Sequence, residues 1–280
     1  MGGFLKEKEL YTIGEVAGIC NISAKALRYY DKIGLLSPDH ISEENGYRYY
    51  SRKTLLLVPV MKYYKQMGFN SEEIPEMLGG NTYQFLQQNF HSKISGLKDM
   101  EREIQGSLAA VKDWYELIKE AELVIRHKIQ DVSVRFIDPA SYCYMDQDFN
   151  YQYMESIINI SWTNYLEAAG QKITGPVILN FSSAAHKMSG TCTRARIMQK
   201  AVWADPEDPA QIMWGGRMAA CAYHVGGYED MGQVYEKILK WADMRGYACD
   251  QGCFERYVID YWTTRSSSEF VTEVIVPVTP

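Results

Sequence analysis

No apolar run in this 280-residue chain approaches the ~20 residues that a membrane-spanning helix needs. The first ten residues, MGGFLKEKEL, lack the apolar stretch of a secretory signal. The six cysteines have no framework spacing, so we expect reduced thiols rather than structural disulfides. These absences predict a cytoplasmic protein without a membrane segment, and they argue against the disulfide-rich secreted class.

Metal-ligand patterns are also scarce. No cysteine lies between Cys20 and Cys143, and Cys249 and Cys253 are separated by three residues rather than the two of a zinc knuckle. The five histidines are scattered along the chain. The sequence therefore predicts no metal site and no cofactor, and it favours a protein that is not an enzyme.

The negative charge lies in the C-terminal half. The net charge is −6, and from residue 130 onward we count 12 Lys+Arg against 18 Asp+Glu, which accounts for all of it. The remainder carries 17 residues of each sign and is neutral. The acidic total therefore does not argue against nucleic-acid binding by the N-terminal part.

The chain divides into three zones that differ in their pattern of apolar and turn-forming residues. Residues 10–80 contain short helical segments separated by turn signals, residues 82–126 lack proline and have helical periodicity, and strand-like runs follow. These zones predict domains at 1–80, 81–127 and 128–280.

The last zone combines strands with two amphipathic helices. The clearest strand-like runs are 132–137, 176–181, 219–223 and 271–276. Helices at roughly 150–169 and 229–245 give each half the order strand, helix, strand, strand. This order predicts a duplicated α+β unit, although no repeat is visible in the residues themselves.

The N-terminal zone predicts two short helices joined by a tight turn. Thr12 to Glu15 has the form of a capping box, which starts a helix. Ser23 is a favourable N-cap for a second helix from Ala24 to about Lys32. Such a pair is a helix-turn-helix, whose second helix enters the major groove of DNA. An ordinary pair of small helices is the alternative that this pattern leaves open.

A β-hairpin is predicted beside the helix pair. Asn45-Gly46 is a strong hairpin signal, because both central residues of a type I′ turn need positive φ. The strand that follows carries Tyr47 and Arg48, which suit contact with a phosphate backbone. A hairpin in this place is the wing of a winged helix-turn-helix.

Three segments together resemble the N-terminal domain of MerR-family regulators: Tyr11–Val16, Ser23–Leu35 and Asn45–Tyr50. The resemblance covers about residues 11–80. It implies that the winged helix-turn-helix is followed by a second pair of helices.

That second helix pair corresponds to about 52–66 and 71–78 in this chain. Pro59 lies inside the first of these helices, where it removes a backbone donor and should kink or shorten the helix. The residues that we predict to contact DNA are Thr12, Lys25, Arg28, Tyr29, Tyr47 and Arg48.

A heptad seam indicates a dimerisation helix in the middle zone. Its positions alternate steps of three and four, with one polar residue: Phe90, Ile94, Leu97, Glu101, Ile104, Leu108, Val111, Tyr115 and Ile118. The resemblance implies a homodimer through an antiparallel coiled coil over 90–118. A long amphipathic helix that lies on its own C-terminal domain is the alternative.

Aromatic residues are more frequent in the C-terminal zone than its core needs, which predicts a lined pocket. Aromatic rings around a carboxylate bind lipophilic cations. Glu255 is the candidate, because a strand at 253–259 places it on one face with Tyr257. A structural ion pair with Arg256 or Arg217 is the alternative.

The C-terminal zone is similar to the GyrI-like effector-binding domain of multidrug-responsive MerR regulators. The similarity rests on Arg217–His224, the helix up to Ala242 and Phe254-Glu255. It implies an effector-binding glutamate surrounded by aromatic residues. The ligand site that we predict is Glu255, Trp162, Tyr223, Tyr257 and Phe270.

These features predict a multi-domain fold with an all-α winged helix-turn-helix, a long dimerisation helix and an α+β GyrI-like domain. The predicted function is a ligand-responsive, sequence-specific regulator that activates RNA polymerase by distorting promoter DNA and senses a lipophilic or cationic small molecule. Two alternatives are a GyrI-like hydrolase fused to the DNA-binding domain and a regulator whose C-terminal domain contacts a protein partner.

Overall fold

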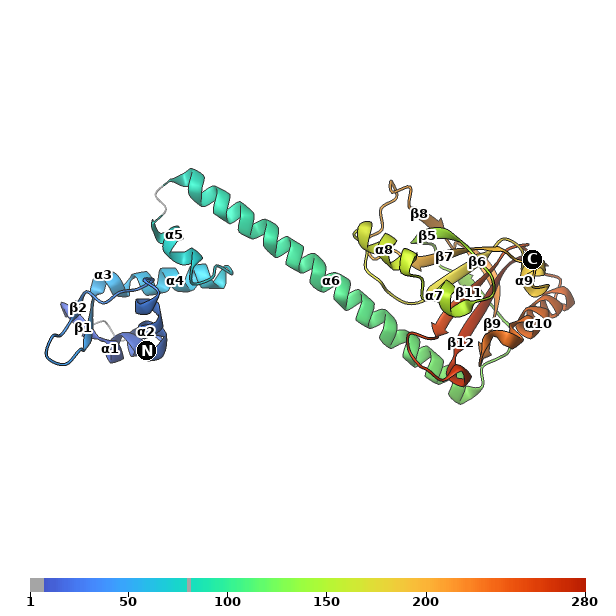
Figure 1. Ribbon diagram of the computed structural model, residues 1–280, viewed down its shortest axis with the longest axis horizontal. Coiled ribbons are helices and arrows are strands. Elements are labelled where there is room, and N and C mark those ends of the chain that lie inside the picture. Colours follow the sequence, from blue (N-terminus) through green and yellow to red (C-terminus); the bar gives the residue numbers. More distant parts are fainter. Residues whose placement is uncertain (1–7, 80–81) are drawn as a thin grey trace. The chain divides into compact units, whose positions relative to one another are not determined.

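The computed structural model describes residues 8–79 and 82–280 and contains two compact units (Figure 1). The first unit is Met1–Glu101 and the second is Arg102–Pro280. The helix α6 (Tyr83–His127) begins in the first unit and ends in the second.

The first two helices begin where the capping residues predict. In front of α1 (Ile13–Cys20), the Thr12 hydroxyl accepts a hydrogen bond from the Glu15 N–H at 3.3 Å, and the Glu15 carboxylate accepts one from the Thr12 N–H at 2.9 Å. Ser23 caps α2 (Ala24–Lys32) through its hydroxyl. The capping box and the helix-turn-helix are confirmed.

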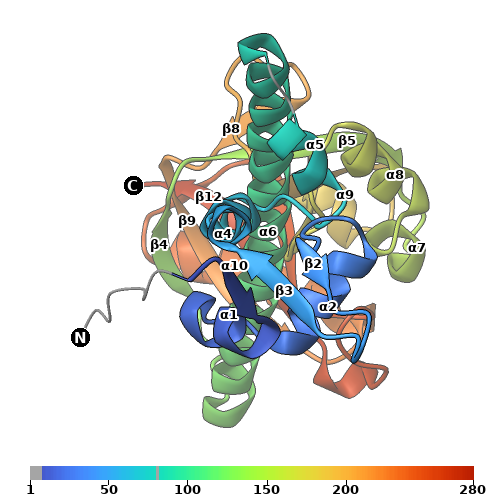
Figure 2. The same cartoon turned by 90° about the vertical axis from the view of Figure 1, so that its left-hand side faces the viewer.

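A three-stranded antiparallel sheet accompanies these helices (Figure 2). Its strands are β1 (Leu10–Thr12), β3 (Arg48–Ser51) and β2 (His40–Ile41), in that order. The predicted wing hairpin is therefore present between β2 and β3.

The predicted type I′ turn of this hairpin is wrong. Gly46 has φ of 69°, but Asn45 does not have positive φ. Instead, the Asn45 side-chain oxygen accepts a hydrogen bond from the Tyr47 N–H at 3.0 Å, and the Ser42 N–H donates to the Tyr47 carbonyl at 2.9 Å. The asparagine side chain thus closes a longer loop, with only the glycine in the left-handed region.

The predicted helix at 52–66 is divided into α3 (Arg52–Leu55) and α4 (Leu57–Gln66). Pro59 lies in the first turn of α4, where a backbone N–H has no intrahelical partner to lose. The expected shortening is confirmed. The next helix is α5 (Glu73–Gly79).

The apolar seam of α6 is largely exposed. The exposed fractions of Ile104, Leu108, Val111, Tyr115 and Ile118 lie between 49% and 67%. A stripe of this kind on one helix is typical of a surface that a second helix covers.

Two parts of α6 pack within the chain. Phe90 contacts Phe69 at 5.5 Å between ring centroids in the core of the first unit. The prediction that Phe90 belongs to the exposed seam is therefore wrong. Near the other end, Leu117, Ala121 and Val124 are buried against the second unit. One face of the helix therefore lies on its own C-terminal domain, while the seam faces outward.

The second unit is built on a nine-stranded sheet with antiparallel pairings. The strand order is β4-β9-β12-β11-β6-β7-β5-β8, and β10 pairs with β12. The strands are β4 (Ser133–Ile137), β5 (Ala140–Asp148), β6 (Val177–Phe181), β7 (Arg194–Lys200), β8 (Gln211–Trp214), β9 (Arg217–Val225), β10 (Ala248–Cys249), β11 (Cys253–Ile259) and β12 (Val271–Thr279).

Six helical segments accompany this sheet. They are α7 (Tyr153–Ile157), α8 (Ile160–Ala168), α9 (Ala184–Met188), α10 (Met231–Met244) and the 3₁₀ turns η1 (Tyr228–Asp230) and η2 (Ser267–Glu269). The predicted helix at 150–169 is two helices, because Asn159 caps α8 by accepting a hydrogen bond from the Trp162 N–H at 3.0 Å.

The duplicated α+β order is confirmed. The first copy is β5, α8, β6 and β7, and the second is β9, α10, β11 and β12. The two copies join where β11 pairs with β6, with Glu255 opposite Leu179. The strand β11 therefore lies in the middle of the sheet, and it carries the candidate carboxylate.

Candidate functional site

The helix α2 presents a basic and aromatic surface. Lys25, Arg28 and Tyr29 are exposed, whereas Leu27 is fully buried and fixes the opposite face of the helix in the core. Tyr47 is exposed at the end of the wing loop. Cationic and aromatic side chains of this kind suit phosphates and base edges, so these four residues remain predicted DNA contacts.

Thr12 and Arg48 have structural partners. The Thr12 side chain belongs to the capping box. Arg48 Nε donates to Asp31 Oδ2 at 2.8 Å, which raises the pKa of Arg48 and ties the wing to the end of α2. Both residues therefore position the DNA-binding surface, and their contact with DNA stays a prediction. The sequence did not single out two further exposed basic residues, Arg52 and Lys53 on α3.

Glu255 on β11 is completely buried, at 0% exposure, and its carboxylate has three donors. Tyr235 OH donates to Oε1 at 2.8 Å and Tyr257 OH donates to Oε2 at 2.5 Å. Lys187 Nζ lies 2.9 Å from Oε1. An unpaired carboxylate in this place would cost several kcal/mol, and these contacts offset that cost.

The cation beside Glu255 is Lys187, whose side chain is 3% exposed. Its Nζ donates to Tyr153 OH at 2.6 Å. The ammonium also lies between 5.0 and 5.8 Å from five ring centroids, those of Phe149, Tyr151, Tyr153, Phe181 and Tyr235. We call these five rings the aromatic cage. The predicted combination of rings and carboxylate therefore exists, and a lysine of this chain occupies it.

The short helix α9 places Lys187 in the cage. Ser183 caps α9, and Tyr151 OH donates to the Lys187 carbonyl at 3.0 Å. Burial, followed by the charge of Glu255, raises the pKa of Tyr235 and Tyr257 well above the ordinary value. Their hydroxyl groups therefore stay protonated and donate to the carboxylate.

A cavity of about 470 Å³ opens beside the cage. Its lining includes three rings of the cage, Tyr151, Tyr153 and Tyr235, together with Lys187 and the exposed Glu229, but not Glu255. The further aromatic and methionine side chains of the lining are Met154, Met188, Tyr228, Met231 and Tyr261, and Gln152, Gly190 and Gly232 complete it. Its size and its many aromatic side chains are typical of small-molecule sites.

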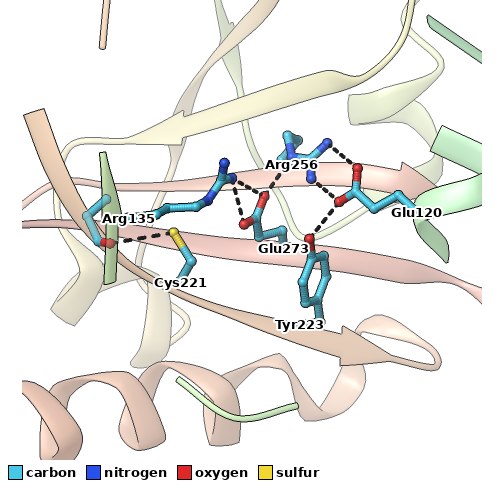
Figure 3. Close-up of polar contacts among 7 residues, drawn as sticks. Glu120, Arg135, Cys221, Tyr223, Arg256 and Glu273 are labelled. Atoms are coloured by element: carbon cyan, nitrogen blue, oxygen red, sulfur yellow. Dashed lines mark hydrogen bonds and ion pairs between the residues drawn. The ribbon is translucent and has the colours of Figure 1, made fainter. Parts of the chain in front are cut away.

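The other face of β11 meets α6 through a network of charges (Figure 3). Arg256 donates to Glu273 at 2.7 Å and to Glu120 of α6 at 3.1 Å. Tyr223 OH donates to Glu120 at 2.7 Å, and Arg135 donates to both oxygens of Glu273, at 2.7 and 2.8 Å. Adjacent residues of one strand thus point to the cage and to the long helix.

Two family models match this chain. The model of the MerR HTH family regulatory protein matches residues 11–80, and the model of the GyrI-like small molecule binding domain matches residues 148–279. The first unit therefore carries a MerR-type helix-turn-helix domain of the kind found in transcription regulators. The second unit carries the GyrI-like domain.

Two curated relatives of this chain come from Bacillus subtilis (strain 168). The multidrug-efflux transporter 2 regulator is 22% identical over 263 residues, 90% of each chain. The multidrug-efflux transporter 1 regulator is 41% identical over 68 residues, 24% of each chain. Among solved structures, the EcmrR–DNA complex in EcmrR-RPo is similar, with a TM-score of 0.44, 20% identity and coverage of 96% of this chain and 99% of that one.

The structure separates the predicted ligand residues into three groups. Tyr257 contacts Glu255 directly. Phe270 is buried and stacks on the cavity residue Tyr228, at 5.4 Å between centroids, so it lies behind the cavity wall. Trp162 and Tyr223 lie elsewhere and are corrections.

Trp162 packs in the core, stacked on Tyr165 at 5.4 Å between centroids. Tyr223 points to α6, where it binds Glu120. The alternative prediction, an ion pair between Glu255 and one of two arginines, also differs from the structure. Arg217 pairs with Asp250 at 2.6 Å instead.

Lys187 is the main residue of the candidate site that the sequence did not indicate. Its only local signal is Ser183, a good N-cap three residues before His186. In the described part of the chain, no helix combines the length and apolarity needed to cross a membrane.

Proposed function

We propose that this protein is a ligand-responsive activator of the MerR family that binds promoter DNA and senses a lipophilic small molecule. The observation that carries the proposal is the 470 Å³ cavity beside the buried Lys187–Glu255 pair, in a chain that also exposes a basic recognition helix. The names of the two Bacillus regulators support the same class of function.

The active form is a homodimer through α6. The exposed apolar positions from Ile104 to Ile118 supply the contact surface. A two-fold dimer recognises a two-fold operator with one winged helix-turn-helix in each half-site. We place this complex in the cytoplasm, with RNA polymerase as its partner at the promoter.

Ligand occupancy reaches α6 through β11. Glu255 accepts a hydrogen bond from the cage residue Tyr235, and its neighbour Arg256 binds Glu120 of α6, so a ligand that moves β11 also changes the contacts of the helix. An effector shifts the dimer between two arrangements by binding one of them better. The favoured arrangement bends and untwists the promoter, at a cost of several kcal/mol that backbone contacts offset.

The alternatives have less support. Glu255 does not line the cavity and already accepts from two tyrosine hydroxyls and lies beside an ammonium, which does not favour a water-activating base. A formed cavity likewise favours a small molecule over a protein partner.

A gel-shift experiment with the DNA upstream of the gene tests the proposal. We expect a specific band at physiological salt for the full-length chain, weakened in Arg28→Ala. Transcription in vitro from the same promoter, with and without candidate lipophilic compounds, then tests activation. Absence of a specific band would refute the function, and a band without any ligand response would refute the effector role.

A further inference from the structure

The aromatic cage contains a complete cation site. The ammonium of Lys187 has a carboxylate at 2.9 Å, a tyrosine hydroxyl at 2.6 Å and five rings within 5.8 Å of it. These are the contacts through which proteins bind ammonium ligands. The group that makes them here is covalently part of the chain.

We propose that Lys187 is a tethered cation that fills the cation position beside Glu255, so that the cavity selects uncharged lipophilic molecules and admits a cation only when Lys187 leaves. The inference deepens the proposed function, because it concerns the effector class of the same cavity.

The cavity lining carries the first argument. Lys187 lines the cavity, whereas Glu255 does not. A cation that enters meets an ammonium whose partner carboxylate is behind it. Glu229, the acidic residue of the lining, is exposed, and water screens its attraction. An uncharged ligand meets instead the phenol hydroxyls and methionines of the wall without displacing any charge.

Competition carries the second argument. A tethered group competes with a free ligand at an effective concentration on the order of millimolar or higher. A free cation must therefore bind well enough to overcome both the ion pair and this tether. Loss of the lysine charge would leave the same carboxylate and rings open to the free cation.

The chemistry of the lysine side chain is compatible with its displacement. The side chain has a flexible four-carbon stem, and its ammonium regains strong hydration in water. Its neighbours Ala185 and His186 on the short helix α9 are exposed, so water is close to the stem. The exchange of one cation for another leaves the site neutral.

The test uses two probes of similar shape and different charge, methyltriphenylphosphonium and uncharged triphenylphosphine oxide. Their dissociation constants are measured by isothermal titration calorimetry with the full-length wild type, Lys187→Met and the double variant Lys187→Met/Glu255→Gln. We expect the phosphonium to bind Lys187→Met at least about tenfold more tightly than the wild type. The gain disappears in the double variant, and the affinity for the oxide changes much less.

An equal or weaker phosphonium affinity in Lys187→Met would overturn the inference, as would an equal gain for both probes, which would indicate added space alone. Lysine acetylation followed by peptide mass spectrometry gives a measurement on the wild type. Saturating phosphonium should accelerate acetylation of Lys187, and the oxide should not; acceleration by neither probe at saturation contradicts displacement. Gel shifts on the same samples test DNA binding independently of the effector class. If Lys187→Met binds the phosphonium and the wild type does not bind DNA, only the proposed regulator function is refuted.

Discussion

The buried pair of Lys187 and Glu255 makes a quantitative prediction about stability. The two side chains are 3% and 0% exposed, so water screens neither charge. Glu255→Gln keeps the shape of the side chain and leaves the ammonium without a counter-charge, and Lys187→Met leaves the carboxylate alone. Removal of one partner of a buried pair costs about 3–5 kcal/mol, whereas replacement of both by neutral groups is often close to neutral.

We therefore expect each single variant to lower the free energy of unfolding by about 3–5 kcal/mol and the double variant to lie within about 1–2 kcal/mol of the wild type. Guanidinium unfolding of the full-length chain, followed by tryptophan fluorescence, measures these differences. All six tryptophans lie in the second unit, so the signal reports on this unit alone.

Two results of this double-mutant comparison would contradict the prediction. Costs below about 1 kcal/mol for both single variants would mean that the pair is solvated in solution. A cost of the double variant equal to the sum of the single costs would mean that the two residues do not interact. Either result refutes the assignment of Lys187 as the cation of the cage.

Four further predictions follow from other parts of the molecule. Arg28→Ala should weaken operator binding by about 1–3 kcal/mol in a gel shift, and Lys240→Ala, an exposed cation on α10, is the matched control that should leave it unchanged. Glu120→Gln removes a charge from the network at α6, so effector affinity measured by calorimetry should persist while ligand-dependent transcription falls; loss of both together contradicts the coupling. Leu108→Glu places a charge in the exposed seam and should convert the dimer to a monomer in analytical ultracentrifugation, whereas an unchanged mass excludes this surface as the interface. Burial raises the pKa of Asp260 to about 6, so the folded state holds this proton more tightly than the unfolded state, and the resulting stabilisation is present below about pH 4 and lost as the pH rises through about 6. Asp260→Asn should remove this slope, worth up to ~3 kcal/mol, from the pH dependence of unfolding, and an identical slope in variant and wild type contradicts the assignment.

The elements that the sequence predicted well are those with strong local signals. Their signals come from residues within about one helical turn of each other. Examples are the capping box at Thr12, the N-cap at Ser23 and the successive turns of the long helix. The strand at 253–259 agrees with β11 residue for residue, because five of its seven residues are apolar or aromatic, as is typical of a buried strand.

The elements that it missed have weak local signals. The helix α9 has five residues and ends at Met188, and β7 is a strand with several polar and charged residues. Neither has the periodicity of an isolated amphipathic element, and each is held by its neighbours in the sheet or the cage. In the hairpin, Asn45-Gly46 favours a type I′ turn, but the Asn45 side chain closes a longer loop instead.

The sequence by itself determined that Glu255 and Tyr257 share a face, because side chains alternate along a strand whatever lies around it. The partners of Glu255 were decided only by the tertiary structure. β6 pairs with β11 and leads through Phe181 to α9, and this long-range pairing brings Lys187 to the carboxylate. A buried charge needs a counter-charge, but the fold alone selects which of the chain's cations supplies it.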